Sequence, residues 1–363
     1  MRTPASPPAP LPAEALERAR QLPKVLLHEH LDGGLRVATL LELLQARGIT
    51  PAASTVEGLA AWFAGNAHAG SLEKYLEGFA LTVAAMASPA ALERVAYEAA
   101  EDALADGAVL AEFRVAPLLF EAHGVAGEAA VEAMLAGLKR SSLPSGLIVC
   151  GMRQLPESET ARAAELALKY RSQGVVGFDL AGPEFGFPPG NHARALQRLR
   201  EAGLPLTLHA GEADGPERVM EAIELGATRI GHGVQLVQAL NDPARAEWVE
   251  RVRESRVHLE VCPSSNVHTG AASSIASHPI TALWQAGVSL GYNTDNRLIS
   301  CVTQSEEAAV LLAHTALEEI DLLAMTTEAA RHAFLPEAQR DAALEAIALF
   351  SAPRLPPVPV VRV

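Results

Sequence analysis

With a formal net charge of −14 over 363 residues, the chain is acidic enough to argue against nucleic acid or an anionic membrane as its main partner, because both select basic surfaces. Its 49% of hydrophobic residues can build a large core, and one α/β barrel with insertions would account for the length. The three cysteines, Cys150, Cys262 and Cys301, lack the paired spacing of a disulfide framework. We therefore expect a reducing compartment, with the cytoplasm as the default.

The two ends of the chain differ in composition from the rest. Residues 1–22 include "MRTPASPPAPLPAE", which is rich in Pro and Ala and has no apolar run of the kind that a signal peptide needs. We expect 1–22 to be a disordered or loosely packed leader and 351–363 to be a Pro-rich tail. No internal repeat or low-complexity linker divides residues 23–350, so these should form one domain.

Short β-like runs recur along the domain, and most are followed by a helix-like stretch. They lie at 25–30, 109–117, 147–153, 175–182, 205–212, 229–234, 257–265 and 288–295. Amphipathic, alanine-rich segments separate them, such as 89–107, which ends at Gly107 as a helix cap. Apolar strands alternating with helices indicate parallel βαβ units, and eight of these favour a closed (β/α)8 TIM barrel over an open sheet.

The longest interval separates the first two runs. It contains "TLLELLQARG" and then "SLEKYLEGFALTVAAM", which is enough for several helices beyond the one that a βαβ unit needs. We expect these to be extra helices inserted after the first strand, over the mouth of the barrel.

The first predicted strand ends in polar residues. In "KVLLHEHLDGG" an apolar run leads directly into His28, His30 and Asp32, which alternation along a strand would point in one direction. Polar side chains that converge at the end of a buried strand either satisfy one another or surround a metal ion. A His-x-His pair is suited to hold one ion from one strand.

Other polar residues fall at the corresponding ends of later strands, where barrels of this type have their active sites. His209 and Glu212 end the fifth predicted strand, His232 the sixth and Asp295 the eighth. With His28 and His30, His209 and Asp295 would complete a set of three His and one carboxylate whose N and O atoms suit zinc, leaving one position for water. By contrast, we interpret His258, in "VHLEV", as an ordinary core residue.

Two further residues have alternative interpretations. Glu212 at the rim of a partly dry pocket would tend to hold its proton and act as a general acid, or it is a helix first-turn carboxylate. Gly182 ends the fourth strand, "VVGFDLAG", and either permits a tight turn or lets a ligand approach the backbone N–H. That strand has no lysine to bridge two metal ions, which favours a single metal.

Six stretches together resemble the adenosine deaminase family. These are "PKVLLHEHLDGGLR", "VVGFDLAGPE", "LTLHAGE", "RIGHGV", "CPSSNVHTG" and "GYNTDNRLIS", which occur in the order and approximate spacing of the family between about Pro23 and Leu349. The resemblance implies a (β/α)8 barrel, one Zn²⁺ per chain and hydrolytic deamination at purine C6.

The resemblance also implies a role for each polar residue of the site. Zn²⁺ would be held by His28, His30, His209 and Asp295. His232 would orient and support the hydroxide that forms on the metal, and Asp295 would hydrogen-bond it. Glu212 would give a proton to purine N1 and so make C6 electrophilic.

Substrate contacts follow from the same resemblance. The backbone N–H of Gly182 would meet purine N3, His30 would border the substrate, and Asp32 would bind the ribose 5′-hydroxyl, which favours a nucleoside over a free base or a 5′-phosphate. Asn296 stands where animal-type members have a second aspartate, and its amide can donate to purine N7 at any pH.

A helical stretch of the insertion resembles the lid of the family. Its apolar residues would form a wall of the substrate pocket, although the same spacing is also that of an ordinary buried helix face. The residues are Leu72, Tyr75, Leu76 and Phe79.

The leading hypothesis is a zinc-dependent deaminase of adenosine and 2′-deoxyadenosine in purine salvage. The alternatives within the same chemistry are a deaminase of a modified nucleoside such as aminodeoxyfutalosine, or of adenine. A metal-dependent barrel hydrolase of a cyclic amide or ester is disfavoured by Glu212, Gly182 and the missing fourth-strand lysine. A non-catalytic barrel is disfavoured because every expected ligand is present. The small-molecule partner would thus be a purine nucleoside, and the sequence leaves a homo-oligomer open.

Overall fold

The computed structural model describes residues 11, 13–68 and 72–351, with only the backbone for 72–76. Within this part, eight parallel strands form two four-stranded sheets in sequential order, β1 to β4 and β5 to β8. The eight strands predicted from the sequence are all present. Their bounds are β1 Lys24–His30, β2 Ala108–Val115, β3 Ser145–Met152, β4 Val175–Ala181, β5 Thr207–Ala210, β6 Arg229–His232, β7 His258–Val261 and β8 Leu290–Tyr292.

The two sheets join at both edges and close into a barrel. A parallel bridge links Phe178 of β4 to Leu206, just before β5. At the other edge the His30 N–H donates to the carbonyl of Asp295 (2.7 Å), and the Asp295 N–H donates to the carbonyl of His28 (2.9 Å). The predicted (β/α)8 barrel is confirmed, and its closure sets Asp295 beside the polar end of β1.

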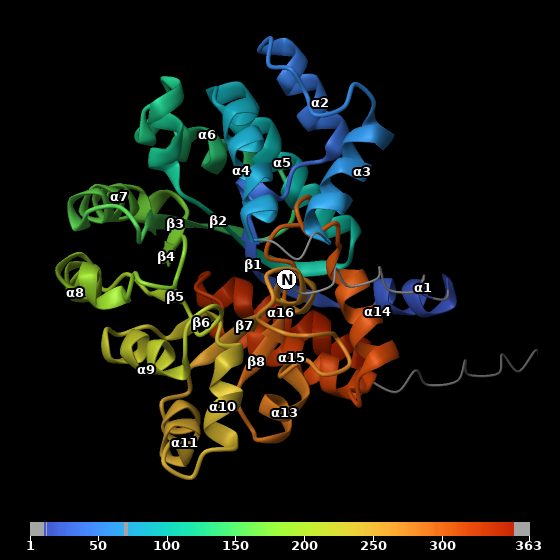
Figure 1. The fold of residues 1–363 in the computed structure, drawn as a ribbon, viewed down its shortest axis with the longest axis vertical. Helices are drawn as coiled ribbons and strands as arrows, with labels where there is room; N and C mark the ends of the chain where they lie inside the picture. The colour runs from blue at the N-terminus through green and yellow to red at the C-terminus, as the bar shows by residue number, and fades with distance from the viewer. Residues whose placement is uncertain (1–10, 12, 69–71, 352–363) are drawn as a thin grey trace, which may run out of the picture.

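Helices surround the strands as an outer ring (Figure 1). Short 3-10 helices, labelled η, complete several of the loops. The helices are α1 Ala13–Gln21, α2 Val37–Ala46, α3 Val56–Ala67, α4 Leu72–Met86, α5 Pro89–Ala105, α6 Gly127–Leu138, α7 Glu157–Tyr170, α8 Ala193–Glu201, α9 Pro216–Glu224, α10 Val237–Leu240, α11 Ala246–Glu254, α12 Pro263–His268, α13 Ile280–Gln285, α14 Gln304–His314, α15 Glu319–His332 and α16 Glu337–Ser351. The 3-10 helices are η1 Leu31–Gly33, η2 Pro117–His123, η3 Arg171–Gln173, η4 Pro189–His192 and η5 Val234–Leu236.

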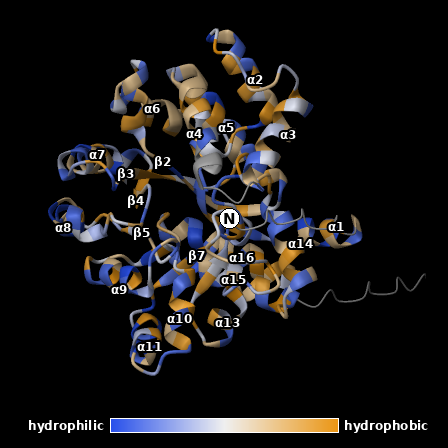
Figure 2. Cartoon of the chain, viewed as in Figure 1, coloured by the Kyte–Doolittle hydropathy of each residue, from blue (hydrophilic) through white to orange (hydrophobic). Residues whose placement is uncertain are grey.

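Helix α8 shows how the outer ring follows from the sequence. Ala195, Leu196 and Leu199 are buried at helical spacing, whereas Arg194 and Arg198 point to solvent. The mixture of hydrophobic and hydrophilic residues on α8, α9 and α11 is visible in Figure 2. Burial of one apolar stripe therefore holds each such helix against the strands.

The insertion after β1 consists of α2, α3 and α4. The helix that follows, α5, packs against α6 and β2 and so serves as the barrel's own helix. Ser88 caps α5 by accepting a hydrogen bond from the Ala91 N–H (3.2 Å), and Pro89 occupies its first turn. Helix α4 lies against η1, directly beyond β1. The expected extra helices are therefore present at the end of β1.

The residues before β1 are more ordered than we expected. Residues 13–21, assigned to a loose leader, form helix α1, which buries Ala19 and packs against α14. Lys24 adds to this attachment, because its ammonium group donates to the carbonyls of Leu22 (2.9 Å) and Asp106 (2.7 Å). The remaining leader residues 1–10 and 12, and the tail from 352 on, lie outside the described residues.

Across residues 13–68 and 72–351, no single helix has the length and apolar character needed to cross a membrane. One helix pair in this part, Glu77–Met86 with Pro89–Ala105, passes the test by length and composition together, but it bends by 116° at its break.

The barrel interior contains a buried ionic network. Arg229 on β6 donates to Glu260 on β7 (Nε to Oε1, 2.6 Å) and to Glu112 on β2 (Nη1 to Oε2, 2.6 Å). Glu112 also accepts hydrogen bonds from the backbone N–H groups of Phe334 and Leu335, after α15. Because these side chains are fully buried, each charge depends on its partners for stabilisation.

Replacing Arg229 with Met should therefore destabilise the fold strongly, because Glu112 loses its cation while remaining buried. We expect a loss of about 3–5 kcal/mol in the free energy of unfolding, measured by denaturant titration. Arg251→Met is the matched control, since Arg251 and Glu224 are both more than half exposed, and its effect should stay below about 1 kcal/mol. Equal losses in the two variants would contradict the role assigned to the network.

Candidate active site

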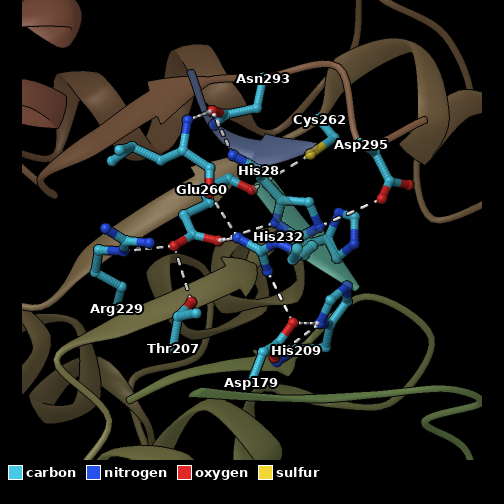
Figure 3. A network of polar contacts seen from close by, with 12 residues as sticks. His28, Asp179, Thr207, His209, Arg229, His232, Glu260, Cys262, Asn293 and Asp295 are labelled. Atoms are coloured by element: carbon cyan, nitrogen blue, oxygen red, sulfur yellow. Dashed lines mark hydrogen bonds and ion pairs between the residues drawn. The ribbon is translucent and has the colours of Figure 1, made fainter. Parts of the chain in front are cut away.

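Four residues from distant parts of the chain converge at the carboxyl ends of the strands. His28 and His30 come from β1, His209 from β5 and Asp295 from the turn after β8, and one ligand atom of each lies within 4.8 Å of the others. The His30 and His209 Nε2 atoms are 3.3 Å apart, and Asp295 Oδ1 lies 3.3 Å from His28 Nε2. Figure 3 shows His28, His209 and Asp295 of this group from close by. The sequence predicted the same four residues as metal ligands.

Two buried carboxylates decide which nitrogens of the histidines face inward. Glu260 Oε2 lies 2.9 Å from His28 Nδ1, and Asp179 Oδ2 lies 2.9 Å from His209 Nδ1. Because an ionised carboxylate only accepts hydrogen bonds, each ring carries its proton on Nδ1 and turns the lone pair of Nε2 toward the cluster.

The cluster fits a metal ion on its own geometry. His28 Nε2 is buried and has no hydrogen-bond partner among the described residues. The Nε2 atoms of His30 and His209 lie 3.3 Å apart, so a cation bound to His209 Nε2 would also be within reach of His30 Nε2. Three imidazoles and one carboxylate form a donor set suited to a divalent transition metal.

Burial keeps two of the histidines, His28 and His30, neutral, as metal ligands must be. Burial lowers the pKa of His28 to about 4, and the nearby Arg114 contributes to the shift. Burial also holds the pKa of His30 well below its usual value. Burial alone would raise the pKa of Glu260, but attraction to Arg114 and Arg229 outweighs it and keeps this carboxylate ionised.

Arg114 on β2 links the two carboxylates that orient the ligands. Its Nη1 donates to Asp179 (2.9 Å) and its Nη2 donates to Glu260 (2.6 Å) and to the carbonyl of Leu27 (2.6 Å). Arg114, Asp179 and Glu260 are all fully buried. A single guanidinium therefore sets the positions of both carboxylates relative to β1.

The backbone is strained at two residues of the site. His232 has a φ of 64° and Asp295 a φ of 61°, values that side chains other than glycine rarely adopt. Such conformations cost about 1–3 kcal/mol each and tend to occur where function requires them. Here they accompany a close approach of His232 to His28, whose ring centroids are 4.9 Å apart.

Glu212 lies beside His232 at the rim of the site. Its Oε2 is 3.6 Å from His232 Nε2, and its Oε1 accepts hydrogen bonds from Thr269 (2.9 Å) and Asn266 (3.3 Å). The side chain is 20% exposed, which leaves it within reach of a ligand. The sequence predicted Glu212 and His232 at this site, and the structure places both beside the cluster.

A second glutamate, Glu184, holds the loop that carries Glu212. Its buried carboxylate accepts hydrogen bonds from the backbone N–H groups of Gly211, Glu212 (2.9 Å), Ala213 (2.7 Å) and Asp214 (3.1 Å). Glu184 therefore fixes the path of the loop and, through it, the position of the Glu212 side chain. No pattern in the sequence predicts this role.

The residues predicted to bind substrate surround the same region. Asp32 lies in η1, where it is 4% exposed and its Oδ1 has no hydrogen-bond partner among the described residues. Burial raises the pKa of Asp32 to about 6. Asn296 lies over η1, since a Cβ added to Gly33 would come within 2.0 Å of Asn296 Oδ1. Asp32 and Asn296 are thus neighbours of the metal-ligand cluster.

Gly182 follows β4 and cannot be replaced without strain. Its φ is 98°, and a Cβ at this position would lie 2.3 Å from Gln154 Oε1. The Gln154 side chain could move away, but the positive φ favours glycine, which agrees with the tight-turn interpretation whether or not a ligand also approaches the N–H.

The predicted lid residues are described only in part. Phe79 is half-buried in α4 and packs against the main hydrophobic core. Leu72, Tyr75 and Leu76 belong to the same helix, but their side chains lie outside the described residues. His258 is fully buried and bonds to Ser289 Oγ (3.0 Å), which confirms its interpretation as a core residue.

Comparison with known proteins places this arrangement in a family. The family model described as adenosine deaminase matches residues 23–349. The chain belongs to the adenosine deaminase family. An adenosine deaminase of Mycobacterium ulcerans is 43% identical over 336 residues, covering 88% of this chain and 92% of the relative.

Several solved structures share the fold. An adenine deaminase from Arthrobacter aurescens aligns with a TM-score of 0.81 at 23% identity, over 91% of this chain and 99% of that chain. An amidohydrolase from Burkholderia ambifaria with bound zinc aligns with a TM-score of 0.79 at 24% identity, over 94% and 95%. At these identities the likeness concerns the fold.

Asp179→Asn tests the orientation of the ligands. An amide at this position no longer has two accepting oxygens for His209 and Arg114, so His209 should lose its fixed tautomer. We expect a divalent metal to bind about 10–100-fold more weakly in chelator competition. Asp242→Asn, a change at a partly exposed side chain outside the site, should leave the affinity unchanged. Unaltered affinity in Asp179→Asn would show that His209 needs no such support.

Proposed function

We propose that the protein deaminates adenosine and 2′-deoxyadenosine by hydrolysis, giving inosine or 2′-deoxyinosine and ammonia, as a step of purine salvage in the cytoplasm. The observation that carries the proposal is the set of three histidines and Asp295 with Glu212 and His232 directly beside it. Membership in the adenosine deaminase family and relatives that bear this name support it.

The metal of the proposal is one Zn²⁺ per chain, held by His28, His30, His209 and Asp295. The donor atoms suit zinc, and the Burkholderia amidohydrolase of the same fold carries that ion. When bound, zinc lowers the pKa of a coordinated water molecule to about 7 and so supplies a nucleophile near neutral pH.

The side chains around the metal would have separate roles in the reaction. Glu212 protonates N1 of the purine, which draws electrons from C6 and prepares it for addition of water. His232 Nε2, which lies 3.6 Å from Glu212 Oε2, and the Asp295 carboxylate hold the attacking water in position. Water provides the oxygen at C6. One of its protons goes to the amino group, which leaves as ammonia when the C6–N bond breaks, and the other returns to Glu212.

Asp32 and its neighbours would select the nucleoside. A buried carboxylate with a free oxygen is suited to accept a hydrogen bond from the ribose 5′-hydroxyl, whereas it would repel the negative charge of a 5′-phosphate. The Gly182 N–H would donate to N3, and the amide of Asn296 to N7. Phe79 and the other residues of α4, Leu72, Tyr75 and Leu76, would cover the nucleoside with apolar side chains.

Glu212→Gln should lower kcat for adenosine by about 10²–10⁴-fold, because the amide cannot transfer a proton to N1. Zinc content, measured by elemental analysis, should stay at one per chain, since Glu212 does not belong to the ligand set. Glu217→Gln is the control: it lies five residues further along, in an exposed ion pair with Arg245. Near-normal turnover by Glu212→Gln would remove this residue as the acid.

Asp32→Ala should reduce kcat/KM for adenosine and 2′-deoxyadenosine while leaving any turnover of adenine unchanged, because adenine has no 5′-hydroxyl. Ultraviolet absorbance on zinc-loaded enzyme, with a chelated control, measures all three substrates, AMP and a 5′-modified adenosine. Fast turnover of the 5′-modified compound beside slow turnover of adenosine would keep the chemistry and assign a modified nucleoside as substrate. An unchanged kcat/KM for adenosine would contradict the role of Asp32.

A further inference from the structure

Asn266, on α12, contacts both of the residues that flank the proposed reaction centre. Its Nδ2 lies 3.3 Å from Glu212 Oε1 and 3.1 Å from His232 Nδ1. Asn266 and His232 are buried. The amide nitrogen is therefore a shared donor between the proposed acid and its neighbouring histidine.

The contact with Glu212 determines which way the amide faces. Glu212 Oε1, which also accepts a hydrogen bond from Thr269, is an acceptor whether the carboxyl group is ionised or carries its proton on Oε2, so the atom of Asn266 that faces it must be the nitrogen. The same nitrogen then donates to His232 Nδ1, which must present a lone pair. A neutral His232 consequently carries its proton on Nε2, the nitrogen that lies 3.6 Å from Glu212 Oε2.

The other end of the amide leads to the same assignment independently. Asn266 Oδ1 lies 3.4 Å from His278 Nε2, and the backbone N–H of Ile280 donates to His278 Nδ1 (3.1 Å). Because Nδ1 accepts a hydrogen bond, a neutral His278 carries its proton on Nε2 and donates it to Asn266 Oδ1.

The His278 ring is neutral in the range where enzymes work. The ring is 4% exposed, and burial, with a smaller effect from His232, lowers its pKa to about 3. The donor and acceptor pattern from Ile280 to His232 therefore stays the same near neutral pH.

We propose that Asn266 and His278 are positioning residues that hold His232 in the tautomer with its proton on Nε2, directed toward Glu212 and the metal-ligand cluster. The proposal rests on the function assigned above, since it gives Nε2–H a task in holding the attacking water. We call the hydrogen bonds from Ile280 through His278 and Asn266 to His232 the relay. Without the relay, His232 could adopt either neutral tautomer, and one of the two has a lone pair on Nε2, where a proton is needed.

Two substitutions at His278 separate the relay from simple structural support. The amide nitrogen of His278→Gln can reach the place of Nε2 and donate to Asn266, but it leaves the Ile280 N–H without its acceptor. The shorter side chain of His278→Asn keeps the acceptor for Ile280 and loses the donor. A merely structural role would not predict opposite effects of these two variants on His232.

The experiment is nitrogen NMR of ¹⁵N-histidine-labelled, zinc-loaded enzyme, in which the chemical shifts of Nδ1 and Nε2 report the tautomer of each ring. The His232 signals are assigned by their loss in His232→Gln. We expect protonated Nε2 in the natural chain and in His278→Gln, and a mixture of tautomers in His278→Asn. With adenosine, His278→Asn should lower kcat about 10–100-fold with little change in KM, and His278→Gln should restore most of it.

Identical His232 signals in the natural chain and in His278→Asn would overturn the proposal, as would a natural chain with the proton on Nδ1. The NMR result does not require turnover. If adenosine is not deaminated but the signals behave as expected, the proposed function fails and the relay stands.

Discussion

The pair of hydrogen bonds from Arg114 to Asp179 and Glu260 is the constraint on which the site depends. Each of these carboxylates also binds the Nδ1 of one histidine of the cluster. A single buried guanidinium therefore determines the positions of ligands on two strands, β1 and β5. Burying such a charge without partners would cost several kcal/mol, so the network is stable only when it is complete. The same buried ionic network therefore orders both the barrel interior and the site.

The site as a whole combines rigid strand ends with loops held by buried polar groups. His28, His30 and His209 lie on strands whose hydrogen bonds fix their backbones. Glu212 lies on a loop, and the Glu184 carboxylate gives that loop the backbone partners that a strand would provide. Glu212, the proposed proton donor, therefore has a fixed backbone position although it lies on a loop, and its side chain remains partly exposed to a ligand.

The barrel and the cluster could be predicted because their signals are local. Apolar runs that alternate with helical segments indicate the strands, and His-x-His on one strand indicates the cluster. The roles of Glu184, Asn266 and His278 could not be predicted in this way, because each depends on contacts between segments that only the fold brings together. Asp179 and Glu260 left a weak signal, a charge inside an apolar strand, whose partners the sequence does not name. Helix α1 was missed because its ordering comes from packing against α14, far along the chain.

The bridge between β1 and the turn after β8 gives the cluster a further consequence. Asp295 and the two histidines of β1 lie on opposite sides of the seam where the first and last strands of the barrel meet. An ion bound by all of them would cross-link this seam, joining residues that are more than 260 positions apart in the chain. Metal binding and barrel closure would then be thermodynamically linked, so that each favours the other. Loss of the ion would therefore weaken the closure of the barrel at this seam.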